Sequence, residues 1–98
     1  MAERGGYVYI MTNKPQGTLY VGETCDLVKR VWEHRNGAFD NSFTNTYKLH
    51  RLVYFEHADE LMAAVRREKQ LKRYRRQWKI ELIESVNPLW QDLYPNLL

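Results

Sequence analysis

A chain of 98 residues with 15 basic residues, 12 acidic residues and one cysteine has room for one compact domain. Its composition, 44% hydrophobic and 28% charged, excludes a disordered tail, and its longest apolar runs, of five residues, exclude a bilayer-spanning helix of about 20. The single cysteine excludes an internal disulfide and predicts a protein of the reducing cytoplasm, and the sequence contains no cysteine–histidine cluster of the zinc type.

The N-terminal third of the chain predicts a hairpin followed by a helix. Residues 7–12 and 18–23 are rich in aromatic and β-branched residues, and the Pro- and Gly-containing stretch between them is typical of a turn. A helix with apolar residues at helical spacing follows, with Thr24 or Asp26 as its cap. The pair Asn36–Gly37 is expected to end it, because glycine readily adopts the left-handed conformation of a helix terminus.

The remainder predicts one more strand and two more helices. Residues 38–50 are polar and predict an irregular connection, and residues 51–57 predict the third strand. The second helix is expected to run from a cap at Asp59 to about residue 74, and the third from about 75 to 86, ending before Pro88. The order β-β-α-β-α-α predicts an α+β domain, in which helices pack on a mainly antiparallel sheet of three strands.

We expect a single domain over residues 1–98, with its core at about 6–88 and a tail at 89–98 that packs back on the body. For a domain of this size, the tryptophans are most simply anchors at the core or its edge. They are Trp32, Trp78 and Trp90.

The net charge of +3 is unevenly distributed. Residues 66–79, which we call the basic segment, hold eight basic residues and one acid, a net charge of +7, whereas the rest of the chain carries −4. Such a segment indicates contact with nucleic acid, although a solvated helix face is the alternative. The eight residues are Arg66, Arg67, Lys69, Lys72, Arg73, Arg75, Arg76 and Lys79.

The single acid of the basic segment, Glu68, lies in the apolar stripe of its predicted helix, three residues beyond Val65. A carboxylate on a core-facing side is costly unless it is paired or bound to a metal. Two interpretations stay open: an ion pair with a basic neighbour, or a lone carboxylate that holds a divalent cation, as Mg²⁺ sites with few protein ligands do.

Two further pairs combine residue types that suit phosphate chemistry. Arg30 and His34 share one helix face, because they are four residues apart. The planar guanidinium of Arg30 suits phosphate oxygens, and the imidazole of His34 can bind or release a proton near neutral pH. Tyr9 and Tyr20 stand one on each strand of the hairpin. Each pair also has an ordinary interpretation, as surface residues of an amphipathic helix and as half-buried sheet residues.

Together these features resemble the GIY-YIG nuclease family, over about residues 7–87. The matching positions are Tyr7-Val8-Tyr9, Tyr20-Val21-Gly22, Thr24, Asp26-Leu27, Arg30, His34, Arg67-Glu68 and Asn87. The eleven-residue separation of the triplets, followed by Arg, His and Glu in order, is a specific signal. Two departures occur: Tyr7 stands where the first triplet has glycine, and Val21 replaces isoleucine. The compact form is similar to small single-domain bacterial proteins related to the nuclease domain of the bacterial excision-repair endonuclease.

The resemblance implies phosphodiester hydrolysis with one divalent ion, Mg²⁺ or Mn²⁺. It implies that Glu68 ligates the metal and that Arg30 binds the scissile phosphate. It further implies that Tyr9 and Tyr20 line the site, where one of them orients or deprotonates water, and that His34 assists proton transfer or phosphate binding. Asn87 would support the site from the far end of the domain. The sequence leaves the choice between a tyrosine and His34 as general base open.

The implied substrate is DNA rather than RNA, recognised by its structure rather than its sequence, with a role in DNA repair or recombination. Phosphate contacts supply affinity without sequence information, and no base-reading module is expected. DNA structure, homodimerisation and a targeting protein partner stay open as sources of specificity, and no membrane partner is expected. The competing hypothesis is a non-catalytic module of the same fold that binds nucleic acid or protein.

Overall fold

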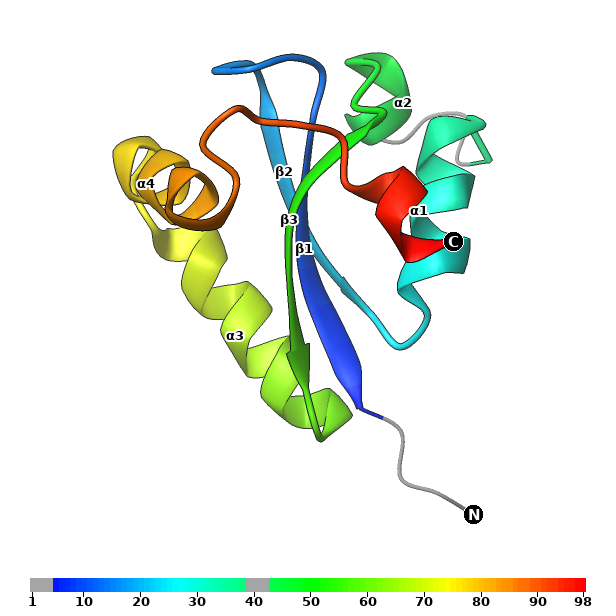
Figure 1. The fold of residues 1–98 in the computed structure, drawn as a ribbon. Helices are drawn as coiled ribbons and strands as arrows, with labels where there is room; N and C mark the ends of the chain where they lie inside the picture. Colours follow the sequence, from blue (N-terminus) through cyan, green and yellow to red (C-terminus); the bar gives the residue numbers. More distant parts are fainter. Residues whose placement is uncertain (1–4, 39–42) are drawn as a thin grey trace.

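The computed structural model describes residues 5–38 and 43–98. Along these residues the elements follow the order β-β-α-α-β-α-α, closed by a short 3₁₀ helix (Figure 1). Their bounds are β1 (Gly6–Thr12), β2 (Leu19–Thr24), α1 (Leu27–Arg35), α2 (Phe43–Thr46), β3 (Arg51–Ala58), α3 (Leu61–Arg73), α4 (Arg76–Val86) and η1 (Tyr94–Leu97).

Within the described residues the strands form a three-stranded antiparallel sheet in the order β2-β1-β3. The predicted α+β fold is therefore confirmed, with β1 in the centre of the sheet. In Figure 1 α3 and α4 lie on one side of the sheet, and α1 and η1 lie on the other. Because both faces are covered, β1 is buried along almost its whole length.

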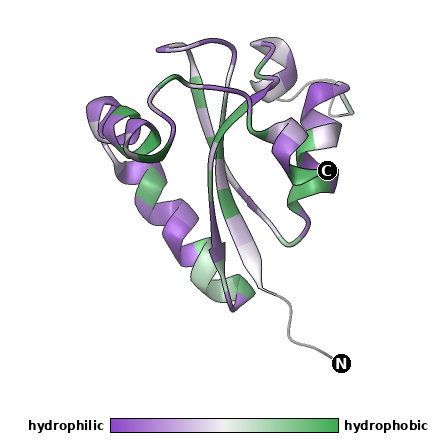
Figure 2. Ribbon diagram, viewed as in Figure 1, coloured by the Kyte–Doolittle hydropathy of each residue, from purple (hydrophilic) through white to green (hydrophobic). Residues whose placement is uncertain are grey.

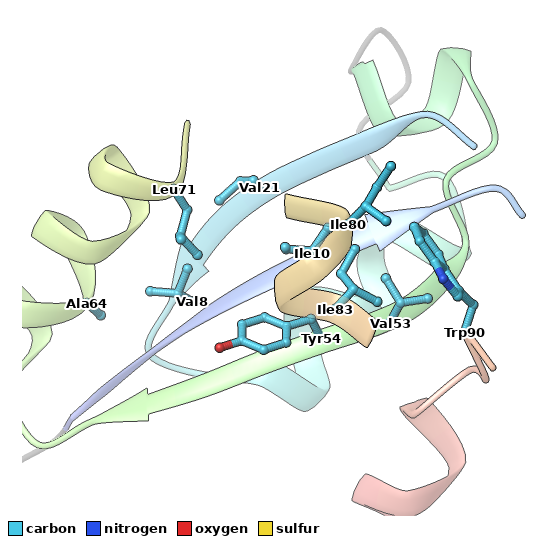
Figure 3. Packing of buried hydrophobic residues seen from close by; sticks show 10 residues of the cluster. All are labelled: Val8, Ile10, Val21, Val53, Tyr54, Ala64, Leu71, Ile80, Ile83 and Trp90. Carbon is cyan, nitrogen blue, oxygen red and sulfur yellow. The ribbon is translucent and has the colours of Figure 1, made fainter. Parts of the chain in front are cut away.

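The alternation of side chains along β1 divides the core in two. Val8 and Ile10 point to the face covered by α3 and α4, where they join Leu71 and Ile83 (Figure 3). Tyr9 and Met11 point to the opposite face, where they pack with side chains of α1 and of the segment around β3. Tyr9 of β1 and Tyr20 of β2 therefore lie on the α1 face of the sheet.

Several expectations about the helix ends are confirmed. Asp26 caps α1, since its side chain accepts a hydrogen bond from the backbone N–H of Lys29. At the other end Asn36 is the C-cap, and Gly37 has a φ of +66°, the left-handed conformation that favours glycine. The C-terminal tail packs back on the body as expected, because Trp90 is buried.

Other expectations are wrong. Asp59 does not cap α3, because the N-cap position is Glu60, whose side chain makes no cap hydrogen bond. Residues 38–50 are not wholly irregular, since they contain the short helix α2. Trp32 and Trp78 are not core anchors, because they are 53% and 49% exposed. Sequence composition favoured burial for all three tryptophans, yet these two lie on outer helix faces.

The helices differ in polarity. Figure 2 shows α3 coloured as hydrophilic along most of its length, in keeping with the basic segment that it carries. Among the described residues, no helix combines the length and the apolar character that crossing a membrane requires.

Candidate active site beside β2

The hairpin brings the two tyrosines together. Tyr9 of β1 pairs with Gly22 of β2, and Tyr20 pairs with Met11, so the rings lie diagonally on one face with centroids 6.3 Å apart. Gly22 is required at this point, because a Cβ atom there would come within 2.5 Å of the Tyr9 hydroxyl oxygen. The missing side chain thus lets the Tyr9 ring reach across to β2.

Helix α1 adds Arg30 and His34 on the same face of the sheet. His34 is buried at 4% exposure, and its Nε2 atom lies 2.9 Å from the hydroxyl oxygen of Tyr9. The other ring nitrogen, Nδ1, lies 2.8 Å from Oγ1 of Thr44, a buried residue of α2. Arg30 forms an ion pair with Glu33, with 3.2 Å between Nε and Oε1.

The local environment favours the neutral forms of Tyr9 and His34. Burial raises the pKa of the Tyr9 hydroxyl, and the neighbouring Tyr20 raises it further, whereas the charge of Arg30 and its hydrogen bond to Tyr9 oppose the shift. Burial lowers the pKa of His34 to about 4, and the charge of Arg30 acts in the same direction. In the tautomer of the neutral imidazole that is protonated at Nδ1, Nε2 accepts the proton of the Tyr9 hydroxyl, whose oxygen accepts in turn from Arg30.

Glu68 approaches the same part of β2 from α3. Its side chain is 14% exposed and forms an ion pair with Lys72, with 2.7 Å between Nζ of Lys72 and Oε2 of Glu68. This hydrogen bond raises the pKa of Lys72, and Tyr20 and Glu23 on β2 add to the effect. Tyr20 and Glu23 also act on the pKa of Tyr9. Helix α3 packs against β2, the edge strand of the sheet, so Glu68 and Tyr9 flank this strand from opposite faces of the sheet.

One family of known proteins is similar over most of the chain. The model of the GIY-YIG catalytic domain matches residues 5–81. The chain belongs to the GIY-YIG family. The family resemblance read from the two tyrosine triplets is thereby confirmed, and the matched span contains every element of the site around β2.

Relatives of the same compact size are similar over most of their length. The UPF0213 protein of Syntrophus aciditrophicus is 37% identical over 82 residues, which cover 84% of this chain and 92% of that protein. A UPF0213 protein of Staphylococcus saprophyticus is 38% identical over 79 residues, 81% of this chain and 94% of that protein. The solution NMR structure of a UPF0213 protein from Bacillus halodurans superposes with a TM-score of 0.55 and 26% identity, covering 90% of this chain and 92% of that chain.

The GIY-YIG site of this chain can hold a divalent cation only with few protein ligands. Among residues 5–38 and 43–98, no group of three histidine, cysteine, aspartate or glutamate side chains comes together. Glu68 offers a half-sheltered carboxylate, and the Lys72 ammonium beside it shows that the position accepts positive charge. Mg²⁺ retains several waters and takes one or two carboxylates together with substrate phosphate oxygens, so this donor set fits the ion.

The basic segment separates into residues with internal partners and residues without them. Arg67 binds Glu56, with 2.9 Å between Nη2 and Oε2, and Arg76 donates to the backbone carbonyls of Gln16 and Gly17. Lys72 pairs with Glu68, and Lys79 is half-buried, which lowers its pKa. Lys72 and Arg76 are exposed despite these contacts, and the exposed members that have no carboxylate or carbonyl partner among the described residues are Arg66, Lys69, Arg73 and Arg75.

Asn87 does not lie with the tyrosines. It is the C-cap of α4, and its Nδ2 group donates to the carbonyls of Val53 and Gln91. Its Oδ1 atom accepts from the backbone N–H of Gln91. Because β3 and β2 are at opposite edges of the sheet, Asn87 fastens the C-terminal tail to β3 on the far side from the candidate site.

Sequence reasoning missed two side chains of the site: Thr44 holds His34, and the ring of Phe43 stacks at 6.2 Å on that of Tyr20. The ion pair of Glu68 with a basic neighbour, one of the two open interpretations, is present, and the neighbour is Lys72. Thr44 and Phe43 belong to a polar stretch without periodicity, so no signal marked them. The i to i+4 spacing of Glu68 and Lys72 was the one signal for the ion pair.

Proposed function

We propose that this chain is a divalent-metal-dependent endonuclease that hydrolyses phosphodiester bonds in DNA. The observation that carries the proposal is the hydrogen bond between Tyr9 and His34 beside Arg30, with the carboxylate of Glu68 on the helix that packs against the neighbouring strand β2. Hydrolysis of a phosphodiester requires a group that takes a proton from water and positive charge near the oxygens that become negative. These side chains supply both, and the family is one of nucleases.

Arg30 and Glu68 would manage the negative charge. The guanidinium of Arg30, which is already a hydrogen-bond donor to Tyr9, would bind a non-bridging phosphate oxygen through its remaining N–H groups. Glu68 would hold Mg²⁺ or Mn²⁺ in place of the Lys72 ammonium. A divalent ion bound there would stabilise the charge that develops on phosphate and leaving oxygens.

Tyr9 and His34 would manage the proton. The raised pKa of Tyr9 argues against a resting phenolate, whereas the low pKa of His34 keeps the imidazole neutral, and the relay uses the tautomer whose unprotonated Nε2 faces the hydroxyl. When water attacks phosphorus, its proton would pass to the oxygen of Tyr9 while Tyr9 passes its own proton to His34. The new bond joins the water oxygen to phosphorus, the P–O ester bond breaks, and the leaving oxygen is protonated from solvent. Thr44 would keep the imidazole oriented throughout.

Recognition in this proposal depends on DNA structure, because the exposed arginines and lysines of the basic segment would contact phosphates. A role in DNA repair or recombination follows from that preference. Homodimerisation or a protein partner would add targeting. The cytoplasmic location predicted from the single cysteine belongs to the same proposal.

The decisive experiment is a cleavage panel. The protein would be incubated with single-stranded, double-stranded, flapped and branched DNA, in Mg²⁺, in Mn²⁺ and in EDTA. We expect cleavage of at least one substrate with metal, no cleavage in EDTA, and loss of cleavage in Glu68→Gln. Glu81→Gln, which neutralises an exposed carboxylate of α4, is the matched control and should cleave normally. Binding without metal-dependent cleavage of any substrate would instead favour the non-catalytic module.

A second experiment separates catalysis from binding. Arg30→Ala should abolish cleavage while DNA affinity falls only a few-fold, because Arg30 would stabilise charge at one phosphate among several contacts. Lys29→Ala, an exposed neighbour on α1, is the control for the loss of one positive charge. An equal loss of binding and cleavage in Arg30→Ala would mean that Arg30 only anchors the substrate.

A further inference from the structure

Trp78 of α4 presents a large aromatic surface to solvent. Its side chain is 49% exposed, whereas the other tryptophan near α4, Trp90, is 2% exposed and belongs to the core. The ring of Tyr74 meets Trp78 edge to face, with centroids 5.6 Å apart and planes at 88°. Tyr74 packs against the core cluster, so it holds the Trp78 indole in place from the side of the core.

Trp78 and Tyr74 form one end of a groove of about 450 Å³ on the outer side of α3, which we call the outer groove. Its lining consists of Arg66, Lys69, Gln70, Arg73, Tyr74 and Trp78. In addition, the guanidinium of Arg75 lies 5.4 Å from the centre of the Trp78 ring. The outer groove therefore combines a positive wall with an exposed aromatic ring.

Three cations of the outer groove have no acidic partner in the part of the chain that the structure describes. Within residues 5–38 and 43–98, no carboxylate forms an ion pair with Arg66, Lys69 or Arg73. The neighbouring Arg67, by contrast, is paired with Glu56 on the sheet side of α3. Exposed cations without internal partners are those that can bind an external polyanion at the lowest desolvation cost.

The outer groove adjoins the candidate active site through α3. Successive residues of a helix are about 100° apart, so Lys69 lies about 60° around the axis from Lys72, and Arg73 lies a further 40° or so along the same direction. Lys72 pairs with Glu68 at the active site, and Lys69 and Arg73 line the outer groove. Lys72, Lys69 and Arg73 thus follow one another around α3, from the helix face of Glu68 to the outer groove that Trp78 also lines.

We propose that the outer groove binds single-stranded DNA, with Trp78 stacking on a base and Arg66, Lys69 and Arg73 contacting the backbone. Stacking suits any base, because every base has a π-face, and phosphate contacts carry no sequence information. In duplex DNA the bases are stacked on one another and are closed to Trp78. This inference rests on the proposed function. It adds the feature of DNA that the nuclease would recognise, an unpaired single strand next to the cleavage site.

Tryptophan fluorescence tests the stacking directly. The full chain would be titrated with an oligothymidylate of about sixteen nucleotides, the upper end of the length that one single-strand-binding domain covers, at low salt without divalent metal. We expect quenching in the wild type and in Trp32→Phe, which removes the other exposed indole, and loss of most of the quenching in Trp78→Phe. Circular dichroism of each variant establishes that the fold is retained.

Affinity measurements complete the test. Trp78→Ala should weaken oligothymidylate binding by about tenfold, whereas Trp32→Ala on α1 should leave it unchanged. Arg73→Ala should reduce the slope of log affinity against log salt by about 0.7, the value for one phosphate contact on a single strand. Retained quenching in Trp78→Phe, or equal small effects of the two alanine variants, would overturn the proposal. Duplex binding that falls as much as single-strand binding in Trp78→Ala would overturn it too.

The outcomes also separate this inference from the nuclease proposal. Oligothymidylate binding through Trp78 without cleavage of any substrate would contradict the nuclease proposal and support the outer-groove proposal. Cleavage of flapped DNA that is as fast in Trp78→Ala as in Trp32→Ala would contradict the outer-groove proposal and support the nuclease proposal.

Discussion

The hydroxyl oxygen of Tyr9 lies 2.9 Å from Nε2 of His34, and both side chains are buried. The burial keeps both groups uncharged, so the contact is a hydrogen bond between a neutral donor and a neutral acceptor. Neither side chain alone would be an effective base. The tyrosine holds its proton too tightly, and Nε2 of His34 is occupied by the Tyr9 hydroxyl, so the pair acts as a unit.

The first prediction concerns this pair. If Tyr9 relays a proton to His34, Tyr9→Phe should lower kcat for DNA cleavage by about 10²- to 10⁴-fold, the range of general base catalysis. His34→Gln should cause a loss of similar size, and the double variant should be no worse than the more damaging single one, because both changes interrupt one transfer. The measurement is single-turnover cleavage at saturating protein.

Tyr7→Phe is the control for this cycle, since Tyr7 lies on the same strand and sheet face and contacts Phe55 and His57 instead. Its cleavage rate should equal that of the wild type. Losses in Tyr9→Phe and His34→Gln that multiply in the double variant would contradict the relay, because independent roles give additive free energies.

The second prediction concerns the residue that orients the imidazole. Thr44→Val keeps the shape of the side chain but removes the hydroxyl from Nδ1 of His34. We expect kcat to fall by about tenfold with KM nearly unchanged, because the imidazole then loses its fixed tautomer and orientation. Thr46→Val, which alters an exposed threonine of the same helix, is the control. A change confined to KM would assign Thr44 to substrate binding.

The third prediction concerns competition between Lys72 and a divalent cation for Glu68. Lys72→Met removes the ammonium 2.7 Å from the carboxylate, so Mn²⁺ should bind roughly tenfold more tightly. Calorimetric titration of the metal with the protein alone measures this without DNA. Lys69→Met, three residues earlier on α3 and lining the outer groove, should leave the Mn²⁺ affinity unchanged. Equal affinities in the wild type and Lys72→Met would place the metal away from Glu68.

The fourth prediction concerns pH. In the folded protein the pKa of His34 is about 4, below its ordinary value of 6.5, so protons bind the unfolded chain preferentially between these values. Stability should therefore be constant above about pH 6.5 and fall by ~3 kcal/mol as the pH drops to about 4. Urea unfolding across this range measures the loss. The pH-dependent loss should shrink in His34→Gln and persist in His57→Gln, which replaces an exposed histidine.

The sequence was sufficient for the fold and for the grouping of four predicted site residues, Tyr9, Tyr20, Arg30 and His34, on one face of the sheet. Alternation along residues 7–12 placed Tyr9 on the opposite face from Val8, and the turn signal set the hairpin that brings Tyr20 beside it. The i to i+4 spacing of Arg30 and His34 put both on one helix face, and α1 then carried them to the tyrosines. These features depend on local periodicity, which a single sequence records directly.

Features that depend on tertiary contacts were not accessible in this way. Thr44 has its role because α2 folds against α1, and nothing in its polar segment indicates that contact. Tertiary contacts also decide which members of the basic segment are available to bind nucleic acid. Arg67 pairs with Glu56 across the interface of α3 and β3, and Arg76 reaches the hairpin turn, so charge counting overstates the exposed charge.

Arg76 joins two parts of the molecule that lie about sixty residues apart in the chain. Its Nη2 atom donates to the carbonyls of Gln16 and Gly17, at 2.6 Å and 2.7 Å, in the turn between the strands that carry Tyr9 and Tyr20. The hairpin and the start of α4 are therefore fastened to each other at the tip. For protein engineering this means that neither part is an exchangeable module. A chimaera that takes its hairpin from a relative with a turn of different length would lose both acceptors for Arg76, and with them the fixed spacing between the tyrosines and the helices that carry the charge.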